Sequence, residues 1–216
     1  MSFKQAEIDK LIELHNEIEG RKKDEFSNPT YLDSPALKNI AEIIASHREY
    51  DPDSLCEANT MLRYIAGCYD DMGRPGLSVR YHDKLLHNCA MLGKKYFNSE
   101  DRLEQLEEDI ADAFWARNYY EPDDCADLFE TLSGMIDEFE LNELLFEAQE
   151  SITIKNDPIE KTEKYLSVID DVEKHIEEQK LCNNCNEIWG LKRHFLEEHG
   201  VDWKSPAVLN PDVQFD

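Results

Sequence analysis

Apolar residues recur every three or four positions along most of the chain, which is the spacing that places them on one face of an α-helix. Glycine and proline number only eight each among the 216 residues, which is too few for a turn-rich all-β fold. The pattern therefore predicts an all-α protein. Eight helices are expected, over residues 8–18, 37–44, 58–72, 77–92, 103–114, 125–139, 141–152 and 159–176. Because the connections between them are short, successive helices should stack as antiparallel hairpins.

Two of the expected helices begin with recognisable local signals. Ser34 precedes Pro35, which predicts a serine N-cap followed by proline at the first helical position, where its missing N–H is not needed. Asp157 precedes Pro158, and Glu160 follows three residues after the aspartate, a spacing typical of a capping box. The second signal predicts a helix that begins at residue 158 and continues to residue 176.

Small and aromatic residues are placed regularly in the third and fourth expected helices. Ala66 and Tyr69 lie in the first of these, and Ser78 lies in the second. This segment resembles a tetratricopeptide repeat, in which small residues at the positions of Ala66 and Ser78 allow two helices to pack closely. An aromatic residue lies between the helices at the position of Tyr69. A helical bundle unrelated to that family is the alternative.

The resemblance implies a binding function rather than catalysis. Weaker copies over residues 110–129 and 144–172 bring the array to about three units, the number that such repeats need to bury a core. We expect this repeat domain to cover residues 1–180. In the family, polar residues on the first helix of each pair line a concave groove that binds a protein or peptide segment. The candidates by helical position are Asn59, Arg63, Asp70 and Arg117, with plain solvent-exposed surface as the alternative interpretation.

The chain is strongly acidic, with 48 Asp and Glu residues against 23 Lys and Arg residues and a formal net charge of −25. Between residues 100 and 150 there are 18 acidic residues and only two basic ones, Arg102 and Arg117. Nucleic-acid binding draws much of its affinity from basic residues, so this charge disfavours nucleic acid as a partner. The acidic run predicts a solvated outer face; a surface for a basic partner, or a mimic of nucleic acid, is the alternative.

The C-terminal part contains four potential metal ligands at regular spacing. Cys182 and Cys185 are separated by two residues, eight residues follow, and His194 and His199 are separated by four. Zinc prefers four nitrogen or sulfur ligands in a tetrahedron, and a Cys-x2-Cys turn presents two thiolates together. The pattern therefore predicts a zinc site, with a redox-active cysteine pair or no special role as the alternatives. The other four cysteines are isolated and should be buried, which favours a reducing cytoplasm over a secreted disulfide framework.

This cluster resembles a Cys2His2 zinc finger, and its short central gap brings it closer to the prokaryotic Ros-type finger than to the eukaryotic one. The resemblance implies a structural zinc ion held by all four side chains, in a module over residues 181–216 with a helix at 191–198. Acidic and basic residues are equal in number over residues 180–204. The finger is therefore expected to stabilise the fold or contact protein rather than bind DNA. Apolar residues of the tail should pack back on the finger or the last helices: Trp203, Val208, Leu209 and Phe215.

Motifs of common enzymes are missing from the sequence. It contains no His-Glu-x-x-His, no phosphate-binding glycine-rich loop and no Gly-x-Ser-x-Gly, so we do not expect an enzyme. It contains no apolar run of 18 or more residues, so we do not expect a membrane span. The sequence predicts a cytoplasmic protein–protein interaction scaffold or adaptor that binds a protein or peptide partner, and a basic partner would suit its charge. The alternatives are a DNA-associated regulator that uses the finger and an acidic inhibitor that mimics nucleic acid.

Overall fold

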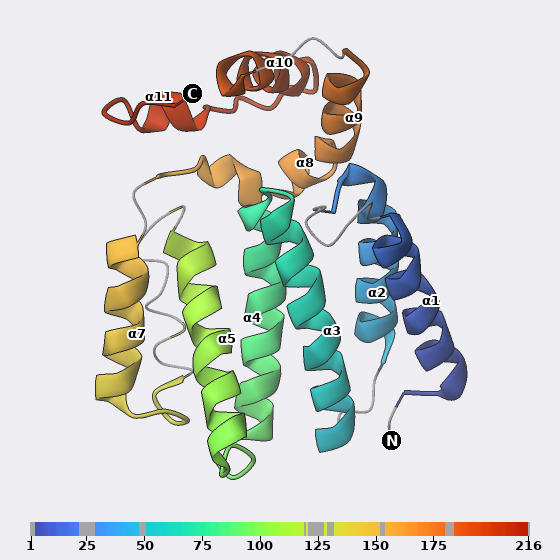
Figure 1. Cartoon of the computed structure of the whole chain (residues 1–216), viewed down its shortest axis with the longest axis vertical. Helices are drawn as coiled ribbons and strands as arrows, with labels where there is room; N and C mark the ends of the chain where they lie inside the picture. The colour runs from blue at the N-terminus through green and yellow to red at the C-terminus, as the bar shows by residue number, and fades with distance from the viewer. Residues whose placement is uncertain are drawn as a thin grey trace.

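The computed structural model describes residues 3–21, 29–47, 51–118, 120, 128, 132–151, 154–179 and 184–215. Every regular element in this part of the chain is a helix, which confirms the all-α prediction. The long helices stand side by side in an array, and each packs against the next (Figure 1). They are α1 (Gln5–Arg21), α2 (Ser34–Ser46), α3 (Pro52–Asp71), α4 (Pro75–Leu92), α5 (Glu100–Asn118) and α7 (Glu138–Ser151).

Shorter elements lie across one end of the array, where the turn between α3 and α4 is found (Figure 1). They are η3 (Pro158–Lys161), α8 (Glu163–Leu166), α9 (Ile169–Gln179), α10 (Cys185–Glu198) and α11 (Pro206–Leu209). A further short helix, η1 (Tyr31–Asp33), precedes α2. The C-terminal part is therefore packed on the array rather than extended away from it.

The α3–α4 hairpin shows why these two helices approach closely. Ala66 and Ser78 are completely buried, so small side chains occupy the contact between the helices. Tyr69 is also completely buried, and its ring stacks on that of Tyr81 with 5.5 Å between centroids. Gly73 makes the connecting turn with φ of 67°, a conformation that side chains other than glycine adopt at a cost. The resemblance to the tetratricopeptide family stays a prediction.

Several helix boundaries differ from those expected. Ser34 is the first residue of α2 rather than its N-cap, and its hydroxyl donates a hydrogen bond to Asp170 at 3.0 Å. The single helix expected from residue 158 to residue 176 is divided into η3, α8 and α9. Thr162 is extended between η3 and α8 and accepts a hydrogen bond from the backbone N–H of Tyr165, so it caps a new helix. Asp157 accepts from the N–H of Ile159, which confirms it as the N-cap, but Glu160 accepts from Trp203 and Tyr120 rather than completing the expected capping box.

Other expected segments are shifted or lie outside the described residues. Six of the fifteen residues of the helix expected over 125–139, namely 125–127 and 129–131, are not described, and residues 133–137 are not helical, so the expected helix does not continue to residue 139 and α7 begins at Glu138. The helix expected over 191–198 begins earlier, at residue 185, because Asn184 caps it. The tail contains a short helix, α11, which is not among the helices expected from the sequence.

The C-terminal elements share the core of the array. Trp203, Leu196 and Val201 are buried in one apolar cluster with residues of α8 and α9. Helix η3 also packs closely against α4. A Cβ atom at Gly76 of α4 would lie only 2.7 Å from the carbonyl oxygen of Glu160 in η3, so a glycine is needed at this contact. The expectation that the tail packs back is confirmed for Trp203. It is wrong for Val208, whose side chain is exposed.

Candidate functional site

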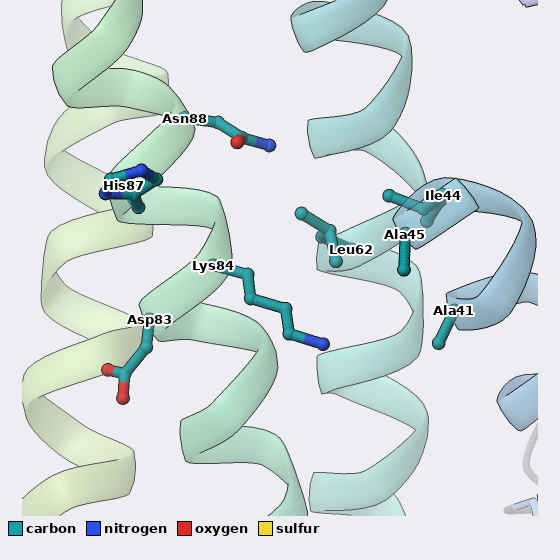
Figure 2. Close-up of a pocket in the computed structure, with 8 residues that line it drawn as sticks. All are labelled: Ala41, Ile44, Ala45, Leu62, Asp83, Lys84, His87 and Asn88. Carbon is teal, nitrogen blue, oxygen red and sulfur yellow. The ribbon is translucent and has the colours of Figure 1, made fainter. Parts of the chain in front are cut away.

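A groove of about 400 Å³ crosses α2, α3 and α4 (Figure 2). Eight residues line it: Ala41, Ile44 and Ala45 of α2, Leu62 of α3, and Asp83, Lys84, His87 and Asn88 of α4. Helices α2 and α4 form the two walls, and α3 lies between them (Figure 2). Ala41 and Ala45 of α2 are four positions apart, as are Lys84 and Asn88 of α4, so each pair lies on one face of its helix.

The two walls differ in chemistry. The α2 wall is apolar, and its alanines at 41 and 45 lie one helical turn apart, where short side chains leave a hollow. Leu62 extends the apolar surface and is itself buried. The α4 wall is polar, with Lys84 and His87 exposed to solvent. The groove therefore offers apolar contact on one side and charge and hydrogen bonding on the other.

Internal contacts determine which groups of the α4 wall remain available. The carboxylate of Asp83 accepts hydrogen bonds from Nη2 and Nε of Arg117 in α5, at 2.6 and 3.1 Å. The amide of Asn88 donates to the side-chain oxygen of Asn59 in α3 at 2.8 Å. The ammonium group of Lys84 lies 5.1 Å from the centre of the Tyr81 ring. These contacts leave Lys84 as the charged group of this wall that points into the groove (Figure 2).

The four partner-binding candidates from the sequence form contacts between helices. Asn59 joins α3 to α4 through Asn88 and through a 3.4 Å contact to the Cys89 sulfur. Arg63 binds Asp109 of α5 through two hydrogen bonds of 2.6 and 2.8 Å. The other two contacts are between Asp70 and His82, with 3.6 Å between Oδ2 and Nε2, and between Arg117 and Asp83. None of the four lines the groove of Figure 2, and their role in binding stays a prediction.

Two of these candidates, Asn59 and Arg63, meet at a smaller hollow of about 170 Å³ between α3 and α5. Its lining also includes Cys56 and Cys89. Burial raises the pKa of Cys89 to about 12, so its sulfur is a protonated thiol at neutral pH. Because Arg63 is already bound to Asp109, this hollow has fewer polar groups available to a partner than the larger groove.

The expected burial of the isolated cysteines is confirmed in part. Cys68 and Cys89 are buried, and Cys56 is half-buried, with its thiol donating to the Tyr96 hydroxyl at 2.7 Å. Cys125 lies outside the described residues.

The structure does not bring together the three predicted zinc ligands that it describes, Cys185, His194 and His199. Cys182 lies outside the described residues, and Cys185 is exposed at the start of α10. His194 follows nine residues later in the same helix, which is about 13 Å at the α-helical rise. Zinc bonds to sulfur and nitrogen are only about 2.0–2.3 Å long. Among the described residues, no group of three or more His, Cys, Asp or Glu side chains could hold a metal ion.

Zinc binding stays a prediction, and it now has a conformational consequence. For the four side chains to bind one ion, α10 must unwind between Cys185 and His194. We therefore expect one zinc per chain in protein purified without chelator, with less helical circular dichroism signal than in the metal-free protein. Cys185→Ser should abolish binding, whereas Cys89→Ala should leave zinc content unchanged because that thiol is buried and protonated. A zinc content near zero with reduced cysteines would contradict the prediction.

No protein-family model matches the chain, and neither a curated protein nor a solved structure shows significant similarity to it. The functional assignment therefore depends on the geometry of the groove. In the described part of the chain, no helix is both long enough and apolar enough to cross a membrane.

Proposed function

We propose that this protein is an interaction scaffold that binds a segment of another protein in the groove between α2 and α4. The observation that supports this proposal is the contrast between the walls. Ala41 and Ala45 offer an apolar surface on one side, and Lys84 offers a charged group on the other. An amphipathic segment can bury its apolar side chains against α2 while its polar groups face α4.

The size and rigidity of the groove suit such a segment. Its volume of about 400 Å³ is within the range of known ligand pockets, about 300–1,000 Å³. Asn59 and Asn88 join α3 to α4, and Arg117 and Asp83 join α4 to α5. These contacts hold the α4 wall in position before a partner binds, and pre-organisation of this kind reduces the entropic cost of association.

The charge of the chain bears on the partner and on the alternatives. A net charge of −25 accelerates the approach of a partner that is basic overall. The C-terminal module is less suited to DNA, because the ammonium group of Lys192 in α10 is turned inward. It lies 4.8 Å from the ring centre of Trp203 and 5.5 Å from that of Tyr165. We therefore favour the scaffold over a DNA-associated regulator, and no contact in the groove specifically favours an acidic mimic of nucleic acid.

A tryptophan in place of Ala45 should block the groove. Peptides selected from a random display library on the full-length protein should bind Ala45→Trp at least about tenfold more weakly, because a large side chain fills the hollow beside Leu62. The free energy of unfolding should change by less than about 1 kcal/mol, since residue 45 is exposed. Isothermal titration calorimetry with the selected peptides and urea unfolding measure the two effects.

The matched control is Asn39→Trp, which places the same side chain on an exposed position of α2 outside the groove. This variant should bind the selected peptides as the unmodified protein does. Equal affinity of the peptides for both tryptophan variants and the unmodified protein would show that the groove is not their binding site.

A further inference from the structure

Lys84 has no acidic partner among the residues that the structure describes. Although acidic residues outnumber basic ones by 48 to 23, no carboxylate of the described residues forms an ion pair with Lys84. Elsewhere in the array the basic residues Lys38, Arg63 and Arg117 each have a carboxylate within 2.6 Å. The side chain of Lys84 instead extends across the groove toward α3 (Figure 2).

The neighbouring aspartate does not compensate for this charge. Asp83 points away from Lys84 (Figure 2), and its carboxylate is bound by the guanidinium of Arg117. The Asp83–Arg117 pair is neutral as a whole, so Lys84 gives the α4 wall a local positive charge. A carboxylate beside the ammonium group would form a charge-assisted hydrogen bond, which is among the stronger polar contacts between proteins.

The opposite wall limits what can accompany that carboxylate. The side chains of Ala41, Ala45 and Leu62 are aliphatic, so a polar group placed against them would lose its hydrogen bonds to water. An apolar side chain would instead gain from leaving water. The groove thus places an apolar contact and a cation on opposite sides of the same bound segment.

We infer that the groove recognises a protein segment in which an Asp or Glu side chain lies close to an apolar side chain, with the carboxylate on Lys84 and the apolar group between Ala41 and Ala45. This inference rests on the proposed function and specifies the chemistry of the partner at that site. Basic residues elsewhere on the partner remain compatible with the acidic surface of the rest of the chain. A Lys or Arg of the partner beside Lys84 is disfavoured by like-charge repulsion.

Peptides selected from the display library and dependent on residue 45 supply the test. They should share an acidic residue near an apolar one, and their affinity should fall about two- to fivefold in Lys84→Gln. Their affinity should also fall as salt is raised from 50 to 500 mM, because salt screens an exposed ion pair. Lys84→Glu should select peptides with Lys or Arg in place of the acidic residue. Lys94→Gln, at an exposed lysine outside the groove, should leave affinity unchanged.

The outcomes separate this inference from the proposed function. Peptides that need residue 45 but contain no acidic residue and bind Lys84→Gln normally would overturn the inference and leave the scaffold proposal standing. A library that yields no peptide dependent on residue 45 would overturn both. Sedimentation of the unmodified protein as a dimer that Lys84→Gln dissociates would also overturn the inference, because a second copy of the chain would then occupy the groove.

Discussion

Replacing Arg74 with alanine should lower the free energy of unfolding by about 3 kcal/mol or more, because the substitution leaves two carboxylates without their buried counter-charge. Arg74 is only 4% exposed and lies at the turn between α3 and α4. Its guanidinium donates hydrogen bonds to Asp170 at 2.5 Å and to Glu173 at 2.6 and 3.1 Å. Both acidic residues belong to α9, so Arg74 joins the C-terminal elements to the array.

The same network predicts a loss of stability in acid. Burial tends to raise the pKa of Asp170, but the hydrogen bond from Lys38 and the positive charge of Arg74 outweigh it, and the pKa is lowered. A carboxyl whose folded pKa is lowered stabilises the protein above its ordinary pKa of about 3.9 and loses that contribution as the pH falls further. The difference in stability between the unmodified protein and Arg74→Ala should therefore shrink below about pH 4.

Urea unfolding at neutral pH measures the effect of Arg74→Ala. Arg193→Ala is the matched control, because Arg193 is 3.9 Å from Glu197 in an exposed pair on α10. That variant should lose less than about 1 kcal/mol, as exposed ion pairs do. If both arginine variants unfold at the same urea concentration, the buried network does not stabilise the junction as described.

Trp203→Ala should also destabilise the protein strongly, by about 3–5 kcal/mol, as is typical of large aromatic side chains lost from a core. Trp203 is 2% exposed, and its indole N–H donates to Glu160 at 2.6 Å. Glu160 is itself buried and accepts a second hydrogen bond from the Tyr120 hydroxyl at 3.2 Å. Burial raises the pKa of Glu160, which means that its charged form is already disfavoured in the folded protein. Loss of the hydrogen bond from Trp203 would make the burial of this carboxylate still more unfavourable.

Hydrogen exchange distinguishes a local effect from a global one. In Trp203→Ala, amide exchange should accelerate most in α10 and α11, while α3 and α4 keep more of their protection because their own contacts remain. Trp189→Ala is the control, since Trp189 is only half-buried at the edge of the core, where its ring lies 5.0 Å from that of Phe215 between centroids. Trp189→Ala should lower the free energy of unfolding by clearly less than Trp203→Ala does. An equal loss from both tryptophans would contradict the anchoring role of Trp203.

The helices of the array could be predicted because apolar spacing reports directly which face is buried. In α3, the residues Ala58, Leu62, Ile65 and Tyr69 follow that spacing, and all four are buried. The spacing does not detect a break such as Thr162, since the apolar residues on both sides of it still fit one helix. That break depends on distant contacts, because Glu160 just before it is held by Trp203 and Tyr120.

The candidate site was harder to predict, because polar residues on a helix look alike in sequence whether they face solvent or another helix. Arg63 and its partner Asp109 are 46 positions apart, and Asp83 and Arg117 are 34 apart. Spacing along one helix does not reveal such pairs. The groove exists because Ala41 and Ala45, one helical turn apart, have short side chains. Both alanines are visible in the sequence, but their spacing alone does not indicate a binding site. The spacing of the predicted zinc ligands likewise did not reveal that a helix capped by Asn184 begins at Cys185.

Site-specific photocrosslinking tests the central claim, that the groove binds a segment of another protein, most directly. A photoreactive phenylalanine analogue is placed at position 45 or, as the control, at position 39, and each full-length protein is irradiated in native lysate. We expect position 45 to give a discrete crosslinked protein whose attachment site, sequenced by mass spectrometry, carries an acidic residue near an apolar one. Excess selected peptide should compete with it, and position 39 should not give it. Identical products from both positions, or products at position 45 that the peptide does not displace, would contradict the claim.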